Sequence, residues 1–137
     1  MARVLIVEDN PANMKLATML LHSAGHSVLG AADAETALRL AHGEQPDLIL
    51  MDIQLPGMDD LAATAILKHD GATSSIPVIA LSALAMKADE ERSQSAGCDA
   101  YIVKPLRYKE LYAVIGRLLA EPEPANGQAA PPGLLPS

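Results

Sequence analysis

The sequence predicts an α/β fold with a five-stranded parallel sheet and helices on both of its faces. Short apolar runs alternate five times with longer segments of helical periodicity, a pattern typical of parallel strands joined by right-handed crossovers. The chain has 137 residues, 50% of them hydrophobic, which is enough for one domain with a hydrophobic core. The run at residues 48–51 is wholly apolar, as expected for a strand buried on both faces.

Turn-forming residues mark where the predicted helices begin and end. Asn10 and Asp33 suit a helix N-cap, and Pro11 suits the first helical position. Gly25 and Gly43 are expected to end the first two helices, because glycine adopts the backbone conformation that commonly follows a helix. The strands are then expected at residues 3–7, 27–31, 48–51, 78–81 and 101–103, and the helices at about 11–24, 34–42, 59–68, 87–96 and 107–119.

Apolar residues in three of these helices recur at the spacing that places them on one face. The fourth helix, residues 87–96, is polar and is expected to bury little. The core-facing residues of the first, second and fifth helices are predicted to be Met14, Ala17, Leu20 and Leu21, then Ala34, Ala37, Leu38 and Ala41, and finally Leu111, Val114, Ile115 and Leu118.

Composition excludes several classes of protein. The net charge of −7 without a basic run argues against direct nucleic-acid binding. No apolar run approaches the ~20 residues that cross a bilayer. The single cysteine, Cys98, excludes an internal disulfide, fits a reducing cytoplasm and is interpreted as a small buried thiol. Residues 1–120 are predicted to form the domain, and the proline-rich residues 121–137 a disordered tail or linker.

Polar residues stand at the carboxyl ends of four predicted strands. Glu8 and Asp9 follow the first strand, and Asp52 follows the third. Ser82 follows the fourth strand and Lys104 the fifth. In a parallel sheet these ends lie on one edge, where open α/β folds place their ligands, so we expect the five side chains to converge.

This set of side chains suits phosphoryl chemistry. Three neighbouring carboxylates repel one another unless a cation lies among them, and hard oxygen ligands suit Mg²⁺. Asp52 would then be able to attack a phosphoryl donor and form an acyl phosphate. Mg²⁺, Lys104 and the Ser82 hydroxyl would hold the phosphoryl oxygens and spread their charge.

Each of these residues also has a simpler interpretation when it is taken alone. Asp52 is then an aspartate that starts a turn, and Ser82 is a helix cap. Glu8 and Asp9 face solvent, and Lys104 is a surface lysine. These separate interpretations explain poorly why all five residues occur at matching strand ends.

The motifs that carry these residues also resemble a known family. They are VLIVEDN at 4–10, DLILMD at 47–52, LPGM at 55–58, ALSA at 80–83 and GCDAYIVKP at 97–105. Over about residues 2–120 the sequence resembles the CheY-like receiver domain of two-component response regulators. VEDN at 7–10, NMKL at 13–16, DIQLP at 52–56 and AMKADEER at 85–92 are most similar to DivK-type single-domain regulators.

The resemblance implies a flavodoxin-like, doubly wound (βα)5 fold with strand order 2-1-3-4-5. It implies that Asp52 receives a phosphoryl group from a sensor histidine kinase or a histidine phosphotransfer protein. It also implies a Mg²⁺ site made by the acid pair Glu8 and Asp9, by Asp52 and by the backbone carbonyl of Gln54. The protein is then a phosphoacceptor switch rather than an enzyme, with self-catalysed phosphotransfer and dephosphorylation.

The resemblance also implies how such a switch works. Ser82 matches the switch hydroxyl, Lys104 the phosphate-binding lysine and Tyr101 the aromatic residue that turns inward on activation. The Lys104-Pro105 peptide is expected to be cis. A downstream protein would bind the face formed by the fourth helix, fifth strand and fifth helix, and the kinase-side partner would dock near the first helix. A cytoplasmic monomer or weak homodimer without membrane or nucleic-acid contact is expected.

One departure and three alternatives accompany this interpretation. Asp60 stands where the family usually has glycine, which would cost roughly 1 kcal/mol if that position needs a positive φ. An aspartyl phosphatase would need a second acid where Gln54 stands, and a nucleotide-binding module would need a glycine-rich phosphate loop. A receiver-like scaffold that is never phosphorylated is the third alternative, although all five site positions carry competent residues.

Overall fold

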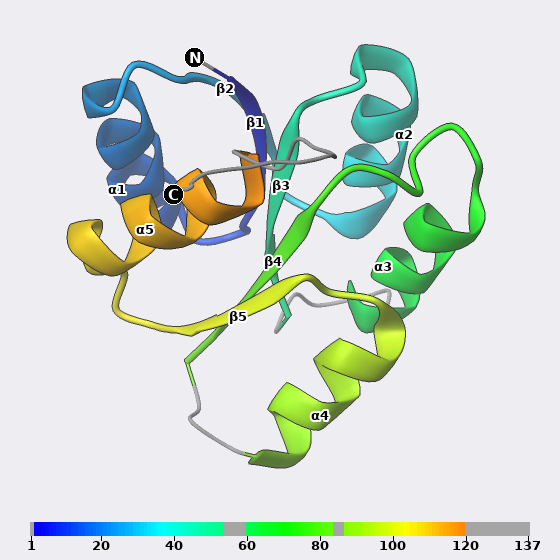
Figure 1. The fold of residues 1–137 in the computed structure, drawn as a ribbon. Coiled ribbons are helices and arrows are strands. Elements are labelled where there is room, and N and C mark those ends of the chain that lie inside the picture. The colour runs from blue at the N-terminus through cyan, green and yellow to red at the C-terminus, as the bar shows by residue number, and fades with distance from the viewer. Residues whose placement is uncertain (1, 54–59, 84–86, 120–137) are drawn as a thin grey trace, which may run out of the picture.

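The five predicted strands form one parallel sheet in the computed structural model, which describes residues 2–53, 60–83 and 87–119 (Figure 1). The strands run in the order β2-β1-β3-β4-β5, which confirms the predicted fold class and strand order. All four neighbouring pairs are parallel. The strands are β1 (Arg3–Val7), β2 (Ser27–Ala31), β3 (Leu48–Asp52), β4 (Val78–Ser82) and β5 (Ala100–Val103).

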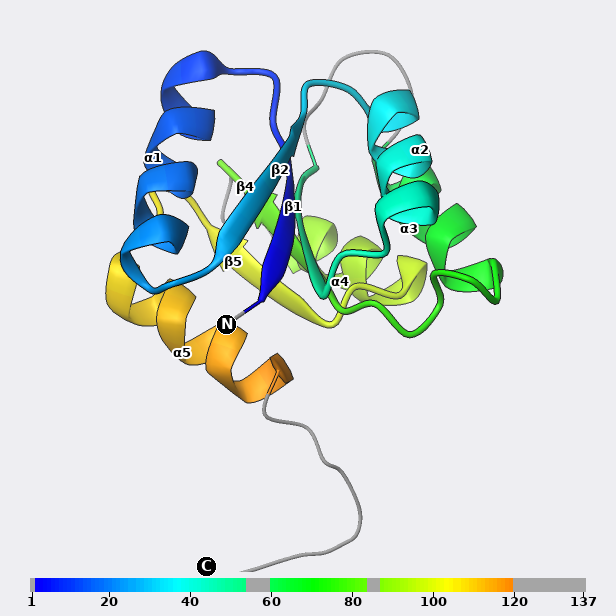
Figure 2. The same cartoon turned by 90° about the horizontal axis from the view of Figure 1, so that it is seen from above.

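Helices cover both faces of this sheet, with α1 and α5 on one side and α2 and α3 on the other (Figure 2). Because side chains alternate along a strand, each strand contributes to a separate core on each face. Every residue of the central strands β3 and β4 is buried, as expected for a parallel sheet covered twice. The helices are α1 (Pro11–Ser23), α2 (Ala34–Glu44), α3 (Asp60–His69), α4 (Lys87–Ala96) and α5 (Tyr108–Leu119).

The two cores contain the residues that the helical periodicity indicated. On one face, the buried Ala17 and Leu21 of α1 and Leu111 and Ile115 of α5 pack against the sheet, with the other predicted residues of these helices partly buried beside them. The opposite core holds the three predicted alanines of α2, together with α3 residues that include Ala63. The core-facing predictions are therefore confirmed.

The predicted N-caps are also confirmed. The Asn10 side chain accepts a hydrogen bond from the backbone N–H of Asn13 at 3.0 Å, and Pro11 is the first residue of α1. The Asp33 side chain accepts one from the N–H of Thr36 at 2.7 Å. Each bond satisfies a backbone donor that the first turn of a helix leaves unpaired.

The prediction that Gly43 ends the second helix is wrong. Helix α2 continues to Glu44, and the left-handed residue that follows it is Gln45, with φ 50°. The Gln45 side-chain amide donates to the carbonyls of Ala41 and His42, so it caps the carboxyl end of the helix and offsets the unfavourable backbone conformation.

The other boundaries differ from the predictions by one residue at most. β3 and β4 each extend to include their terminal polar residue, Asp52 and Ser82, and β5 begins at Ala100. Helix α5 begins at Tyr108 rather than one residue earlier. Asp60 is the first residue of α3, so the positive φ considered for that position does not arise.

Two predictions fall on residues outside the described ranges. These are the backbone carbonyl of Gln54 as a metal ligand and the tail at residues 121–137. Within the ranges that the structure describes, no helix is long and apolar enough to cross a membrane.

Candidate functional site

Three of the predicted acids meet at the carboxyl edge of the sheet. Glu8 and Asp9 directly follow β1, and Asp52 is the last residue of β3, the neighbouring strand. One carboxylate oxygen from each of the three residues lies within 4.8 Å of the others. Glu8 and Asp52 are only 4% and 3% exposed, whereas Asp9 faces solvent. The cluster is therefore a nearly buried pair of acids with a third at its mouth.

Lys104 supplies the positive charge in this cluster. Its Nζ donates to Glu8 Oε1 at 2.8 Å and to Asp52 Oδ2 at 3.1 Å, so one ammonium bridges the two buried acids. The backbone N–H of Asn10 donates to the second oxygen of Glu8 at 3.2 Å. Three carboxylates and one ammonium leave the cluster with a negative formal charge.

Backbone hydrogen bonds fix the segments that carry these side chains beyond the ends of the strands. The N–H of Glu8 donates to the carbonyl of Ala31 at 2.9 Å, and the N–H of Ile53 donates to that of Leu81 at 2.9 Å. The N–H of Lys104 donates to the carbonyl of Ser82 at 2.7 Å, and the Lys104-Pro105 peptide is cis, as predicted. The site is thus built on rigid parts of the sheet.

Ser82 and Tyr101 emerge from the same face of the sheet. Ser82 is fully buried at the end of β4, next to the strand that carries Asp52. Tyr101 on β5 lies beside Ala80, two residues before Ser82, and side chains two residues apart on a strand share a face. Tyr101 is half-buried. The sheet therefore places the predicted hydroxyl and aromatic residue in neighbouring positions on the face opposite α1 and α5.

Burial and charge shift two pKa values in the cluster. Burial, together with the neighbouring Asp52 carboxylate, raises the pKa of Glu8 above its ordinary value of 4.5, although the hydrogen bond from Lys104 opposes this. Burial also acts to lower the pKa of Lys104, but its contacts with Glu8 and Asp52 prevail and raise that pKa above 10.5. Folding thus favours the charged form of Lys104 and disfavours the charged form of Glu8.

The raised pKa of Glu8 predicts that Glu8→Gln stabilises the protein at neutral pH when divalent metal is removed. Because the folded-state pKa of Glu8 lies above 4.5, the folded protein binds this proton more tightly than the unfolded chain does. The wild type therefore loses stability as the pH rises from 4.5 through the folded pKa, and the uncharged glutamine does not. Thermal unfolding in a chelating buffer should give the variant a Tm advantage that grows across this window. An advantage independent of pH would contradict the explanation.

The cluster fits a small hard cation. Magnesium favours oxygen ligands, accepts one or two carboxylates and keeps several waters. Glu8, Asp9 and Asp52 each provide one carboxylate oxygen as a possible ligand. Because Asp9 is exposed, water could complete the coordination from the solvent side. This geometry agrees with the residue types that the sequence indicated, and the Gln54 carbonyl lies outside the described residues.

The sequence did not indicate an apolar recess beside the charged cluster. A cavity of about 50 Å³ lies between α1 and the segment after β5, and Glu8 and Lys104 form part of its wall. Leu16 and Leu106 line it and also border an open groove between α1 and α5. Leu16 is 40% exposed. In the sequence, the signal that could have indicated the recess is that this leucine lies outside the predicted core-facing stripe of its helix.

Comparisons with known proteins agree with this arrangement. The family model of the response regulator receiver domain matches residues 4–116. The chain is 46% identical over 118 residues to the polar-differentiation response regulator DivK of Brucella anthropi, covering 86% of this chain and 96% of that protein. DivK of Brucella ovis has the same identity and coverage.

A solved structure with a related fold contains a metal. It is the receiver domain of the sensor histidine kinase PA1611 from Pseudomonas aeruginosa, described with a magnesium ion coordinated in its active site cleft. The two chains are 35% identical, with a TM-score of 0.82 over 88% of this chain and 98% of that one.

Proposed function

Because the chain belongs to the response regulator receiver domain family of two-component systems, we propose that Asp52 is its phosphoacceptor and that the reaction requires Mg²⁺. The observation that carries the proposal is the bridge from Lys104 to Glu8 and Asp52 at the carboxyl edge of the sheet. One cation and two further acids, Glu8 and Asp9, thus lie around the nearly buried Asp52 carboxylate. A structural aspartate at a turn would need neither.

The chemistry follows from these positions. A carboxylate oxygen of Asp52 attacks the phosphorus of a phosphohistidine, and the electron pair of the breaking P–N bond passes to the imidazole nitrogen. Lys104 exchanges part of its contact with the carboxylates for a phosphoryl oxygen, whose charge it neutralises. Magnesium bound by Glu8, Asp9 and Asp52 would supply further charge neutralisation. Burial of Asp52 limits the access of water to the acyl phosphate and so slows its hydrolysis.

The same proposal includes a conformational switch. Phosphorylation adds about −2 of charge at Asp52. The Ser82 hydroxyl, at the end of the adjacent strand, would then reorient toward the phosphoryl group. Tyr101, which shares its face of the sheet, would turn inward, and the surface formed by α4, β5 and α5 would change for a downstream protein. The shared face and adjacent strands support this coupling.

A kinase-side partner would dock along the groove between α1 and α5. Leu16 and Tyr108 line this groove and are 40% and 54% exposed, so it offers an apolar surface to a partner. Arg107, Lys109 and Glu110 also line the groove, and together they give it a positive formal charge of one. Since the groove meets the recess beside Lys104, a helix lying in it would bring a phosphohistidine close to the acid cluster.

The test is incorporation of a phosphoryl group from acetyl phosphate, followed by intact mass. We expect the mass to rise by one phosphoryl group with Mg²⁺ present and to stay unchanged when a chelator removes it. A purified phosphohistidine donor should give the same product faster. Failure of both donors with Mg²⁺ present would favour the scaffold alternative instead.

Asp9→Asn should separate metal binding from folding. Asp9 faces solvent, so the substitution should change the free energy of unfolding without metal by only about 0.5 kcal/mol. Its affinity for Mg²⁺ should fall at least about tenfold, the lower bound for groups that merely support a metal ligand. Calorimetric titration with Mg²⁺ measures this change, and wild-type affinity in the variant would remove Asp9 from the proposed site.

A further inference from the structure

The groove between α1 and α5 is held in shape by a tyrosine that joins its two walls. Tyr112 of α5 donates its hydroxyl to the carbonyl of Leu20 in α1 at 2.8 Å. Its ring also meets that of Tyr108 edge to face, with the ring centroids 5.9 Å apart and the planes at 65°. Leu20 lines one wall of the groove and Tyr108 the other, so Tyr112 fixes their separation. The groove is thus preformed, as ligand sites usually are.

This groove combines apolar and aromatic surface with positive charge. It has a volume of about 650 Å³ and is lined by leucines on the side of α1. Lys109 Nζ lies 6.0 Å from the centre of the exposed Tyr108 ring. Neither Arg107 nor Lys109 forms an ion pair with another of the residues that the structure describes. Their charges are therefore available to a ligand.

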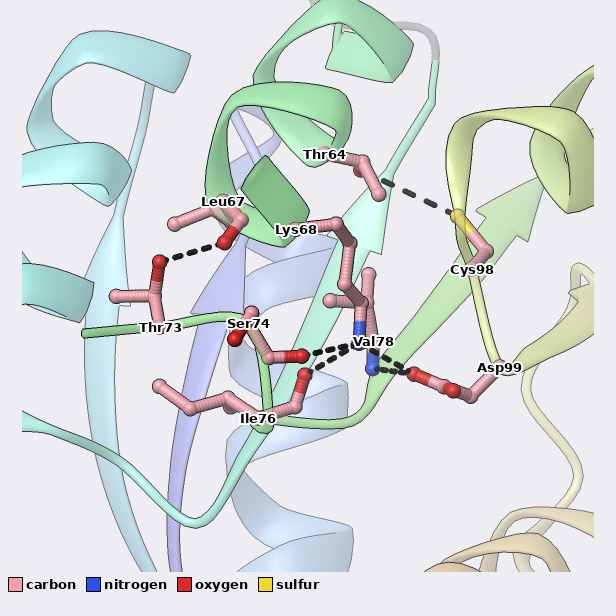
Figure 3. A network of polar contacts seen from close by, with 9 residues as sticks. All are labelled: Thr64, Leu67, Lys68, Thr73, Ser74, Ile76, Val78, Cys98 and Asp99. Carbon is pink, nitrogen blue, oxygen red and sulfur yellow. Dashed lines mark hydrogen bonds and ion pairs between the residues drawn. The ribbon is translucent and has the colours of Figure 1, made fainter. Parts of the chain in front are cut away.

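A lysine on the opposite face of the sheet shows the contrasting case, a cation already engaged by the fold (Figure 3). Lys68 Nζ donates to the carbonyl of Ile76 at 2.8 Å and to Asp99 Oδ2 at 2.9 Å. Only 17% of the Lys68 side chain is exposed. The groove between α1 and α5 differs, because both of its cations are exposed.

The tail at residues 121–137 has the composition that such a groove would bind. It lies beyond the receiver-domain match, which ends at residue 116. It contains five of the ten prolines, two acids and no lysine, arginine or histidine. Its large apolar side chains are Leu134 and Leu135, which lie between prolines. Proline-rich segments commonly dock in grooves lined by aromatic side chains, and opposite charges favour the encounter.

The tail is also long enough to reach the groove. Helix α5 has 12 residues and is about 18 Å long, with the groove at its amino end and the tail following its carboxyl end. Leu134 follows Leu119 by 15 residues, and a flexible chain of that length has a typical end-to-end distance of about 20 Å. A tether whose typical length matches its span gives a high effective concentration, so weak contacts suffice.

From this match of chemistry and reach we infer that residues 131–136 occupy the groove between α1 and α5 in the free protein, with Leu134 and Leu135 against its apolar wall. The occupancy itself does not depend on Asp52. Its consequence rests on the proposed function: a kinase-side partner has to displace the tail, so the tail slows phosphotransfer from a protein donor and not from a small one.

The test attaches a nitroxide spin label to the tail and measures the broadening of amide signals in the full chain. Ser137→Cys carries the label, and Cys98→Ser removes the other thiol. We expect broadening at residues 16–20 and 106–110, whereas residues 67–76, on the face shown in Figure 3, stay sharp. Broadening that is absent, or equal in both regions, would overturn the occupancy.

A pair of variants tests which tail residues bind. Replacing Leu134 and Leu135 together by aspartate keeps the length of the tail and should reduce broadening of the groove to the level at residues 67–76. Replacing Ala129 and Ala130 together by aspartate adds the same charge and keeps both leucines, so the wild-type pattern should remain. Unchanged broadening in the leucine variant, or equal loss in both, would show that the leucines do not hold the tail.

A mixed sample separates this contact from one between two copies of the chain. Isotope-labelled chain without nitroxide is combined with unlabelled chain that carries it. No broadening of the groove is expected, because the contact lies within one chain. Broadening there would assign the groove to the tail of a second copy and overturn the inference.

Phosphorylation assays separate the inference from the function on which its consequence rests. Acetyl phosphate should label the leucine variant at the wild-type rate, whereas a purified phosphohistidine protein should label it faster than the wild type. Equal rates with the protein donor would remove the tail from regulation. Absence of labelling with either donor, in a chain that still shows the broadening, would overturn the proposed phosphoacceptor and leave the occupied groove in place.

Discussion

Asp52→Asn is expected to abolish covalent phosphorylation of the protein while leaving its fold intact. The amide has nearly the same shape as the carboxylate and still offers an acceptor oxygen to Lys104, which lies 3.1 Å from Asp52. It lacks the anionic oxygen that attacks phosphorus, so no acyl phosphate forms. Intact mass after incubation with acetyl phosphate and Mg²⁺ should match that of the untreated variant.

The matched control for this loss is Asp47→Asn. Asp47 lies just before the amino end of β3 and accepts the backbone N–H of Arg3 at 2.8 Å, far from the acid cluster. An asparagine there retains an acceptor for that bond. The control should therefore be phosphorylated like the wild type, and equal loss in both variants would point to a defect in folding instead.

Lys104→Met should combine a large loss of stability with a loss of switching. The substitution leaves Glu8 and Asp52 as two nearly buried acids without their shared cation. Removing one partner of a buried ion pair costs about 3 kcal/mol or more. Chemical denaturation at neutral pH measures this change, and Arg39→Met, which removes an exposed cation, should change it by only about 0.5 kcal/mol.

The effect of pH gives this prediction a second test. The folded pKa of Lys104 lies above 10.5, so its contribution to stability is fully present below 10.5 and is lost as the pH rises through the folded value. The difference between wild type and Lys104→Met should therefore shrink in strongly alkaline buffer. A difference that stays constant through that window would mean that methionine harms packing rather than charge pairing.

Switching should fail in the same variant for a separate reason. With methionine at position 104, no ammonium reaches the phosphoryl oxygens or those positions in their mimic, beryllofluoride. Beryllofluoride should therefore leave the amide chemical shifts of Ser82 and α4 unchanged, even if it still binds at Asp52. Addition of Mg²⁺ should restore part of the stability, because it neutralises the same carboxylates. A wild-type response of α4 in the variant would remove Lys104 from the switch.

The sequence predicted the sheet and the converging strand ends because these depend on local patterns. Apolar runs mark the strands, and the parallel arrangement brings their carboxyl ends together, so the meeting of Glu8, Asp52 and Lys104 could be predicted from the sequence. The end of α2 could not be placed in this way. Gln45 takes the left-handed position by means of its own side-chain bonds, while Gly43 is the residue that local preference favours.

Contacts between distant segments could not be predicted from the sequence for a different reason. Lys68 and Asp99 are 31 residues apart, and nothing in their local patterns links them. Likewise, the recess lined by Leu16 and Leu106 depends on how α1 packs against the segment after β5. Pairing of this kind depends on tertiary packing, which neither propensity nor periodicity encodes.

Chemical mapping of the modified residue shows whether the phosphoryl group resides on Asp52. Borohydride reduces an aspartyl phosphate to homoserine, which peptide sequencing by mass spectrometry locates. After treatment with acetyl phosphate and Mg²⁺, we expect homoserine at position 52 and at no other aspartate. Homoserine at Asp9 or elsewhere, or a phosphate retained on a serine, would show that Asp52 is not the phosphoacceptor.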